Sequence, residues 1–380
     1  MAHIRKHPET GKPQVRWRDP ATGKERTKTF HRSTDARAFK AQVEHKINRG
    51  IYLDRSLGKI PFEEVAVGWL ESKVNLRLST WTRDESYLRN HVVAAFGPFP
   101  VGGMRKIDVQ EWIRELQEKG LASATIRQCY RILKSVMDEA VEHKLIAESP
   151  CRKIALPRAD RQEHPYLEPA EVKRLAVAID PAFRALVYSA AYLGCRWGEL
   201  VGLKRQNLNL LRHQVIIVGS LEEVGGRAPR YVEETKTRST RRTLTVPSFL
   251  CEILGAHLSL VPESEFVFVG RDGGLLRRNN FRRRQWKPAV LRAGVPERLR
   301  FHDLRHTCAS ILISQGAHPK EIQARLGHAS IITTMDRYGH LFPSLGEHLD
   351  KNLEHAYRST RSVDPAQIEN GERVMPGGSG

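Results

Sequence analysis

The sequence predicts a multidomain α+β protein: a small N-terminal β-sheet plus a helix, an all-α four-helix domain, and a mainly α domain with a small antiparallel β-sheet. Three observations support this fold class. The 380 residues suffice for about two to four domains of roughly 100 to 200 residues each. Apolar residues alternate near the N-terminus and then recur at helical spacing between residues 61 and 157. Beyond residue 166, β-forming segments interrupt a second helical region.

Charge and composition narrow the class of protein. The formal net charge is +19, with 40% hydrophobic and 28% charged residues, so the chain can form conventional cores and is expected to bind an anionic partner. The sequence has no apolar run of about 18 residues and no signal-peptide pattern after Met1, and we expect a cytoplasmic protein without membrane contact. The five cysteines are scattered and never spaced as CxxC, which argues against a disulfide framework or a structural zinc site.

Residues 1–60 carry much of the positive charge, with 15 Lys or Arg against 6 Asp or Glu. Two alternating segments, residues 14–17 and 26–30, flank turn-forming residues and predict a β-hairpin. Apolar residues then predict an amphipathic helix that begins near Ser33 and ends before Gly50. We expect this small basic domain to contact DNA, and a solvated basic surface is the alternative. The expected DNA contacts are Arg16, Arg18 and Lys28.

Residues 61–157 show helical periodicity in four segments, marked by Trp69, Leu88, Trp112 and Tyr130. Glycine and proline at residues 97–98 and glycines at 102–103 break the pattern between them. We expect four helices whose polar side chains contact phosphates, and the alternative is an ordinary solvated surface. The candidate contacts are Thr82, Arg83, Arg127 and Arg131.

The third domain is expected to cover residues 158–355, after a basic linker. Its pattern predicts helices at 168–178 and 183–193 and strands at 215–218, 231–236 and 242–246. An arginine-dense stretch contains Arg282 and Arg283 and is interleaved with Phe281 and Trp286. We expect a DNA-facing helix there, with a solvated helix face as the alternative. Residues 356–380 show no core-forming pattern and are expected to be a flexible tail.

Two motifs place cationic and imidazole side chains beside apolar helices. In GCRWGEL, Arg196 follows an apolar segment, so it either binds an anion or pairs with Glu199. In FHDLRHT, His302 and Arg305 are three residues apart and share one face of a helix. This is not a zinc helix of HExxH type, because no glutamate lies between His302 and His306. No metal is therefore expected.

Two further motifs, LGHASI and DRYGHLF, follow within a short distance. Gly327 permits a helix to end in the left-handed conformation, and Ser330 can cap the next helix. That helix carries Tyr338, which either is exposed for chemistry or packs as an ordinary aromatic residue.

The four motifs in this order resemble the tyrosine recombinases, in particular the integrases of phages and other mobile elements, over essentially the whole chain. The resemblance implies an arm-site DNA-binding domain at residues 1–60, a helical core-binding domain at 61–157 and a catalytic domain at 158–355. It implies an enzyme that cuts and rejoins DNA through a 3′-phosphotyrosyl intermediate, without a cofactor or metal. A type IB topoisomerase and a DNA-binding regulator that no longer cuts are the alternatives.

The resemblance also implies roles for single residues. Arg196 and Arg305 would be the paired arginines that bind the phosphate, and Tyr338 the nucleophile. Guanidinium groups suit the first role because they stay charged and bind phosphate oxygens in a planar fork. A lysine can release a proton to the leaving oxygen, whereas an arginine cannot. The remaining expected site residues are Lys236 as general acid, His302 as the base for the tyrosine, His328 as a phosphate or positioning contact, and Glu199 as support.

The partners follow from the same resemblance. Strand exchange between two duplexes needs four active sites, so we expect a homotetramer on double-stranded DNA with core-type and arm-type attachment sites. A host DNA-bending protein and an excision factor are further expected partners. The leucines at 345, 349 and 353 predict a helix that packs on a neighbouring protomer, or alternatively on its own domain.

Overall fold

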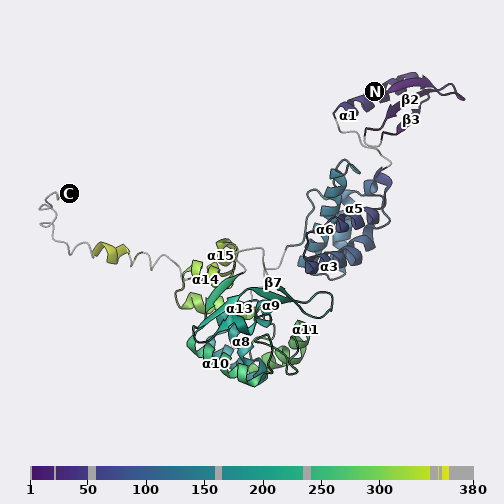
Figure 1. Ribbon diagram of the computed structural model, residues 1–380. Helices are drawn as coiled ribbons and strands as arrows, with labels where there is room; N and C mark the ends of the chain where they lie inside the picture. Colours follow the sequence, from purple (N-terminus) through teal and green to yellow (C-terminus); the bar gives the residue numbers. More distant parts are fainter. Residues whose placement is uncertain are drawn as a thin grey trace, which may run out of the picture. The chain divides into compact units, whose positions relative to one another are not determined.

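The computed structural model describes residues 2–20, 23–49, 57–158, 165–233, 241–342, 350 and 353–358. The chain divides into two compact units, residues 1–162 and residues 163–380 (Figure 1). Buried apolar side chains form one cluster within residues 2–43, a second within 62–151, a third within 167–304 and a fourth within 309–338. Among the described residues, no helix combines the length and the apolar character needed to cross a membrane.

A three-stranded antiparallel sheet begins the chain. It consists of β1 (His3–Lys6), β2 (Pro13–Arg18) and β3 (Glu25–Thr29) in that order, and helix α1 (Ser33–Asn48) follows. Val15 and Trp17 of β2 are buried against α1, where the Trp17 ring lies 5.5 Å from the Phe39 ring. The predicted hairpin and helix are confirmed. The sequence pattern does not predict β1, because its four residues are all exposed and lack apolar alternation.

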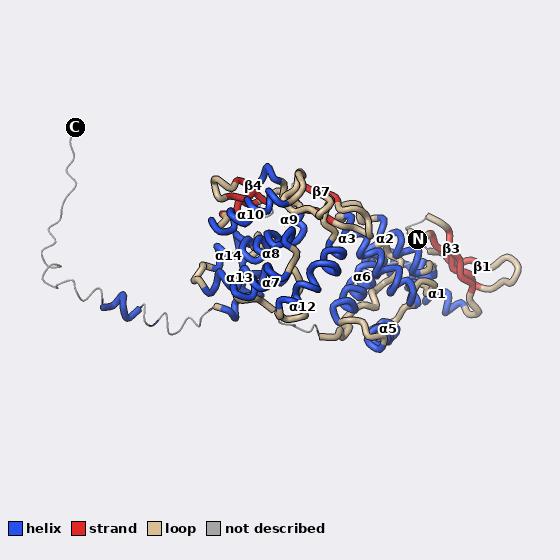
Figure 2. Tube along the Cα trace, turned by 90° about the horizontal axis from the view of Figure 1, so that it is seen from below, coloured by secondary structure: helices blue, strands red, loops and turns tan. Residues whose placement is uncertain are grey.

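The predicted four-helix region is also confirmed, and it is entirely blue in Figure 2 apart from its loops. Trp112 and Phe96 meet edge to face at 5.3 Å in its core, and the Trp69 indole donates a hydrogen bond of 3.0 Å to Ser135 Oγ. Its elements are η1 (Leu57–Lys59), α2 (Phe62–Glu71), α3 (Leu78–Tyr87), a π-helical turn η2 (Leu88–Val93), α4 (Ala94–Phe96), η3 (Val101–Gly103), α5 (Lys106–Glu118) and α6 (Ser123–Glu142). Helix α3, η2 and α4 form one continuous segment, so four helices pack together.

The second unit is mainly helical, as the sequence predicts. The two helices expected at 168–178 and 183–193 are α7 (Pro169–Ala178) and α8 (Pro181–Leu193). Further helices are α9 (Trp197–Val201), α10 (Ser248–Leu260), α11 (Arg278–Phe281), the π-helical turn η5 (Arg282–Trp286), α12 (Lys287–Ala293), α13 (Asp303–Ser314), α14 (Pro319–Leu326), α15 (Ile331–Tyr338) and the 3-10 turns η4 (Arg205–Asn207) and η6 (Gly339–Leu341).

The described strands of the second unit form two small antiparallel sheets, whereas the sequence predicts one. The first contains β4 (Leu208–Asn209), β5 (Gln214–Ile217) and β8 (Arg242–Thr245), and the second contains β6 (Gly219–Glu222) and β7 (Arg230–Glu233). The chain changes sheet at Gly219, where a Cβ would lie 2.6 Å from the backbone carbonyl oxygen of Val232 in β7. A side chain at this position would displace β7, so the close approach of the strands requires glycine.

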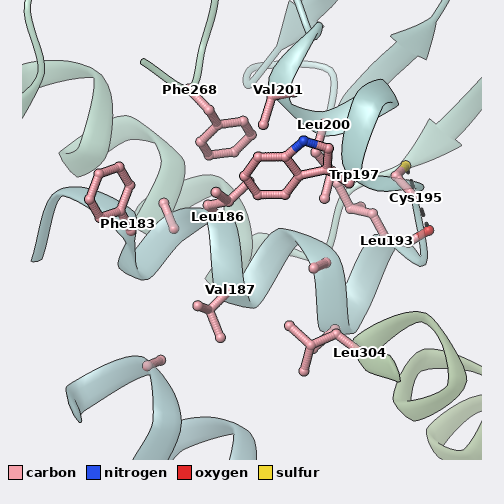
Figure 3. Packing of buried hydrophobic residues seen from close by; sticks show 14 of the residues in the cluster. Phe183, Leu186, Val187, Leu193, Cys195, Trp197, Leu200, Val201, Phe268 and Leu304 are labelled. Carbon is pink, nitrogen blue, oxygen red and sulfur yellow. Dashed lines mark hydrogen bonds between the residues drawn. The ribbon is translucent and has the colours of Figure 1, made fainter. Parts of the chain in front are cut away.

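Helices α8 and α13 pack against each other within this unit. Figure 3 shows Leu186 and Leu193 of α8, Trp197 of α9 and Leu304 of α13 in one buried cluster. Burying these side chains removes apolar surface from water and fixes α13 on α8. The first turn of α13 therefore lies beside the C-terminal end of α8, where the next helix begins.

Gly194 makes this junction possible. It ends α8 with a φ of +67°, in the left-handed region that favours glycine. A Cβ at this position would lie 2.6 Å from Leu326 Cδ2 and 3.0 Å from Cys308 Sγ. Its carbonyl accepts a hydrogen bond of 2.6 Å from Arg305 Nη1. Helices α8, α13 and α14 consequently meet at a residue that has no side chain.

We predict that Gly194→Ala lowers the free energy of unfolding by about 2–5 kcal/mol. The left-handed conformation costs a residue with a Cβ roughly 1–2 kcal/mol, and overpacking adds roughly 1–3 kcal/mol. The matched control is Gly294→Ala, which has a similar φ of +62° but no atom within 4 Å of the added Cβ. This control variant should lose only the stability that the left-handed conformation costs, roughly 1–2 kcal/mol. Denaturant unfolding measures both changes, and equal losses in the two variants would contradict the packing argument.

Candidate active site

The residues expected to act on the phosphate come from four segments that meet at the end of α8. Arg196 immediately precedes α9, His302 and Arg305 begin α13, His328 follows α14, and Tyr338 ends α15. Arg196 Nη2 donates to the carbonyl of Gly327 at 3.5 Å, which joins the α9 and α14 segments. The His328 and Tyr338 rings lie nearly parallel with centroids 6.4 Å apart. The fold therefore gathers these five side chains in one region.

Arg196 is held by an acidic neighbour but remains accessible. Its Nη1 donates to Glu199 Oε1 at 2.7 Å, and its backbone N–H donates to Glu199 Oε2 at 2.8 Å. The side chain is 45% exposed, so it is not enclosed by the apolar residues around it in the sequence. The pairing with Glu199 and a role in anion binding are thus compatible, because the ion pair orients a guanidinium group that still faces solvent.

Glu199 is shared with a second arginine, Arg242 of β8. Arg242 Nη2 donates to Glu199 Oε2 at 2.8 Å and Nη1 to Oε1 at 3.3 Å, and both side chains are buried. Burial raises the pKa of Glu199, but the hydrogen bonds and charges of Arg242 and Arg196 outweigh it and lower this pKa to about 2. The carboxylate is ionised at neutral pH. The sequence signal for Arg242 is only a basic residue at the start of a predicted strand.

Arg305 is buried where helices α8, α13 and α14 meet at Gly194. Its guanidinium group donates to the Gly194 carbonyl. Burial, and then the nearby charge of Arg196, lowers the pKa of Arg305 to about 10, so it remains a cation at neutral pH. Burial of a cation favours binding of an anion at the same place, because the charge is weakly screened there.

Both expected histidines are neutral at neutral pH. Burial first, and the charge of Arg305 second, lowers the pKa of His302 and the pKa of His328 to about 4 each. His328 Nδ1 lies in a hydrogen bond of 2.8 Å with Thr334 Oγ1, which fixes the orientation of its ring. A neutral imidazole has one N–H, so each histidine can donate one hydrogen bond.

Tyr338 is buried, with 3% of its surface exposed. Its ring packs in a cluster with Ile322 and Leu326 of α14. Burial raises the pKa of the Tyr338 phenol to about 12, against the opposing charges of Arg305 and Arg337. The ring therefore packs as an apolar aromatic residue would, while its hydroxyl reaches the charged part of the site.

The Tyr338 hydroxyl oxygen lies 2.9 Å from Nδ1 of His306, a buried residue of α13. The expected base for this tyrosine is His302, whose ring instead stands perpendicular to that of His306 at 5.7 Å. Sequence reasoning uses His306 only to exclude a zinc motif. In the sequence, a role for His306 is indicated only by its position four residues after His302, which places both histidines on the same face of a helix.

Lys236, the expected general acid, lies outside the described residues, as do Leu345 and Leu349 of the expected helix beyond the tyrosine and most of the expected tail. The described residues 353–358 are helical, and Leu353 is exposed. Within the described ranges, no group of three or more His, Cys, Asp or Glu side chains could hold a metal ion.

The expected DNA contacts of the N-terminal sheet fall on two faces. Arg16 and Arg18 alternate with the buried Val15 of β2, so they point away from α1. Lys28 lies directly opposite Val15 in β3 and therefore shares the face that α1 covers. Its Nζ lies 4.7 Å from the centre of the Phe39 ring. Arg16 and Arg18 thus lie on the open face, whereas Lys28 lies on the α1 side of the sheet and is still exposed to solvent.

In the four-helix region, two of the expected contacts, Arg83 and Arg131, bind the buried carboxylate of Asp84 in α3. Arg131 of α6 donates to Asp84 Oδ2 at 3.1 Å, and Arg83 donates to Oδ1 at 3.4 Å. Arg127 lies one turn before Arg131 and is exposed, and Thr82 adjoins Arg83 and is half-buried. The buried acid therefore brings arginines of two helices onto one surface.

In the arginine-dense stretch, Arg282 and Arg283 are exposed on the η5 turn. The two aromatic residues whose interleaving favours a DNA-facing helix point inward. Phe281 and Trp286 are buried, and the Trp286 indole donates to the carbonyl of Leu299 at 3.0 Å. Burial of their large apolar surface decides their direction, and the arginines lie on the exposed face.

Two family models match the chain. One, described as "Phage integrase family", matches residues 165–344, and another, described as "Phage integrase, N-terminal SAM-like domain", matches residues 61–117. The integrase of Mycobacterium phage L5 is 31% identical over 281 residues, which are 71% of this chain and 73% of that protein. A "Tyrosine recombinase XerC-like" protein of Caldanaerobacter subterraneus subsp. tengcongensis is 28% identical over 360 residues, 84% of this chain and 90% of that protein.

Solved structures show the same fold. The Tn1549 transposon integrase in complex with transposon right end DNA has a TM-score of 0.68 at 19% identity, covering 78% of this chain and 99% of that one. A lambda integrase tetramer bound to a Holliday junction has a TM-score of 0.58 at 16% identity, covering 89% of this chain and 95% of that one.

We predict that stability without DNA falls as the pH is lowered from 6.5 toward 4. The folded pKa of His302 and that of His328 are about 4, below the ordinary value of 6.5, so the unfolded chain binds protons in this window that the folded chain does not. The stability that these two neutral histidines contribute is fully present above pH 6.5 and is lost as the pH falls from 6.5 toward 4. Thermal unfolding across the window measures the slope. The double variant His302→Gln/His328→Gln should give a shallower slope, and an unchanged slope would contradict this assignment.

We predict that Glu199→Ala costs about 3–5 kcal/mol of stability, because it leaves the buried charge of Arg242 without its carboxylate. The control is Glu265→Ala, which removes a 2.7 Å ion pair with Lys204 from a carboxylate that is 60% exposed. A surface pair of this kind contributes about 0–1 kcal/mol. Urea unfolding compares the two variants. A loss at Glu199 as small as that at Glu265 would show that the shared carboxylate is not a structural requirement.

Proposed function

We propose, since this chain belongs to the phage integrase family of tyrosine recombinases, that it integrates and excises a phage or other mobile DNA element through a 3′-phosphotyrosyl intermediate on Tyr338. The observation that supports the role of these residues is the convergence of two arginines, two neutral histidines and a tyrosine from four segments of the chain. A phosphodiester needs this set of groups: fixed positive charge, hydrogen-bond donors and a nucleophile.

In the proposed reaction, Arg196 and Arg305 bind the non-bridging oxygens of the scissile phosphate. The exposed guanidinium of Arg196 is oriented by Glu199, and that of Arg305 by the Gly194 carbonyl. Charge grows on these oxygens as phosphorus becomes pentacoordinate, and donors already in place stabilise it without reorganisation. His302 and His328 each donate one hydrogen bond to the same phosphate, in keeping with their neutral state at neutral pH.

Tyr338 Oη then attacks phosphorus, and the bond from phosphorus to the 5′ oxygen breaks. We assign Lys236 as the acid that protonates the departing 5′ oxygen, because an ammonium group can release a proton at low cost. The tyrosyl ester conserves the energy of the broken backbone bond. Attack by the 5′ hydroxyl of another duplex then reseals the strand, so the exchange needs no ATP.

The proposed partner is double-stranded DNA with core-type and arm-type attachment sites, bound by a homotetramer during strand exchange. We propose residues 1–60 as the arm-site domain, 61–157 as the core-binding domain, 158–355 as the catalytic domain and 356–380 as a tail. The open face of the N-terminal sheet, with Arg16 and Arg18, supports a DNA-binding surface additional to the catalytic one. A relaxing topoisomerase does not need a second such surface, so recombination is favoured.

The cell compartment and accessory partners complete the proposal. We propose that the protein works in the cytoplasm of a bacterial host, where its DNA substrate lies, with a host DNA-bending protein and an excision factor. The C-terminal segment that contains the helical residues 353–358 is proposed to pack on a neighbouring protomer of the tetramer.

We predict that Tyr338→Phe abolishes the covalent adduct while DNA binding is retained. The substitution removes the reacting oxygen and preserves the ring that packs against α14. The substrate is a nicked duplex that carries the core-type attachment site. It traps the ester because the short cleaved strand diffuses away. A denaturing gel detects the adduct and a mobility shift measures binding. An adduct that persists in Tyr338→Phe would refute the nucleophile assignment.

A further inference from the structure

The oxygen proposed to attack DNA already has a hydrogen-bond partner. Tyr338 Oη lies 2.9 Å from His306 Nδ1, and the two residues are only 3% and 6% exposed. Their ring centres are 5.5 Å apart and the ring planes are inclined by 60°, so the phenol meets the edge of the imidazole where its nitrogen lies. A hydrogen bond of this length between buried groups is a direct route for a proton.

The position of His306 is tied to the phosphate-binding arginine. It directly follows Arg305 in the first turn of α13, and Arg305 is anchored to the Gly194 carbonyl. Tyr338 reaches the same place from the end of α15, where its ring packs against α14. The phenol and the imidazole are thus held by different helices, and the packing of α13 against α14 sets the distance between them.

The other two histidines are less suited to take the proton. The His328 ring is nearly parallel to the Tyr338 ring, at 12°, and its Nδ1 is engaged with Thr334. A parallel ring presents its face to the phenol, and the face carries no lone pair. His302 lies beside His306, the histidine that contacts the phenol, and its ring is perpendicular to the His306 ring.

A proton acceptor is needed because burial raises the pKa of Tyr338 to about 12. At neutral pH on the order of one phenol in 10⁵ would be ionised without help. An uncharged phenol is a weak nucleophile, and a base within hydrogen-bond distance removes this handicap as the new bond forms.

We propose that His306 is a catalytic residue that accepts the phenol proton of Tyr338 through Nδ1 during attack and returns it during resealing. This inference rests on the function proposed above. The bond between Oη and phosphorus forms, the bond between phosphorus and the 5′ oxygen breaks, and the phenol proton moves to Nδ1. The 5′ oxygen receives its proton from a separate acid. Before attack, His306 must be the tautomer that carries its proton on Nε2, and in the covalent intermediate it is an imidazolium ion.

The surrounding charges couple this transfer to DNA. The charged and titratable groups around the Tyr338–His306 pair are Arg305 and Cys308 of α13, Arg337 of α15, His302 and His328. While no anion is bound, the positive charge of these arginines disfavours the protonation of His306 to an imidazolium ion. A phosphate bound between Arg196 and Arg305 offsets that repulsion, so His306 becomes an effective base when the substrate is in place.

The test is His306→Asn in the full-length protein, with single-turnover cleavage of the nicked duplex described above. Asparagine can hold a hydrogen bond at the position of Nδ1 but its amide does not accept a proton. We expect cleavage to slow by about 10²–10⁴-fold near neutral pH, with DNA binding and melting temperature close to those of the wild type. The loss should shrink as the pH rises toward the value at which the phenol ionises without a base.

The matched control is His318→Asn, since His318 Nδ1 also accepts a hydrogen bond, from the N–H of Lys320 at 3.2 Å, at the start of α14. Asparagine is a favoured residue at this position, so cleavage should be unchanged. If His306→Asn cleaves as fast as the wild type, or if its loss is the same at every pH, the proposal is overturned. If the wild-type protein itself forms no adduct, the proposed function fails and not this assignment alone.

A second measurement needs no change at His306 and stands even if the variant fails to fold. Tyr338 is replaced by 3-fluorotyrosine, whose phenol is more acidic, in the otherwise wild-type protein. If His306 takes the proton, the pH at which cleavage reaches half of its plateau reflects the imidazole and does not move. A shift of this midpoint to lower pH, by as much as the phenol acidity changes, would mean that the phenol ionises alone and would overturn the proposal.

Discussion

The hydrogen bond from the buried Arg305 guanidinium to the Gly194 carbonyl is the constraint on which the site depends. It joins the first turn of α13 to the end of α8 at a position where a Cβ would clash with Leu326 and Cys308. Arg196 follows Gly194 by two residues and His306 follows Arg305 directly, so one contact positions both proposed phosphate ligands and the partner of the nucleophile. Burying a cation this way is unfavourable without compensation, and the backbone carbonyl and a bound phosphate supply it.

The site carries an excess of positive charge that is balanced only when an anionic substrate is bound. Glu199 balances Arg196 and Arg242. Burial first, and then the charges of Arg305 and the exposed Arg337, lower the pKa of His302 and of His328 and keep both neutral. A DNA phosphate would bring these groups into balance. The buried nucleophile fits the same design, because a phenol that is neutral and hydrogen bonded is unreactive until an anion changes the field around it.

The sequence predicts the helical and strand regions well wherever apolar periodicity is strong, as in the four-helix region. It misses β1, whose four residues carry no such pattern, and it cannot orient Lys28, because only the register with Val15 shows which face it occupies. The motifs and their resemblance to a known family identify Arg196, His302, Arg305, His328 and Tyr338 as a set. They do not identify His306 or Arg242, since the partners of these residues come from α15 and α9, and only tertiary packing creates those contacts.

The most direct test of the central claim is a structure of the covalent complex with a nicked attachment-site duplex. We predict that the 3′ phosphate carries Tyr338, that Arg196 and Arg305 both bind its non-bridging oxygens, and that Arg305 still donates to the Gly194 carbonyl. A phosphate that lies away from Arg305, or an ester on a different residue, would contradict it.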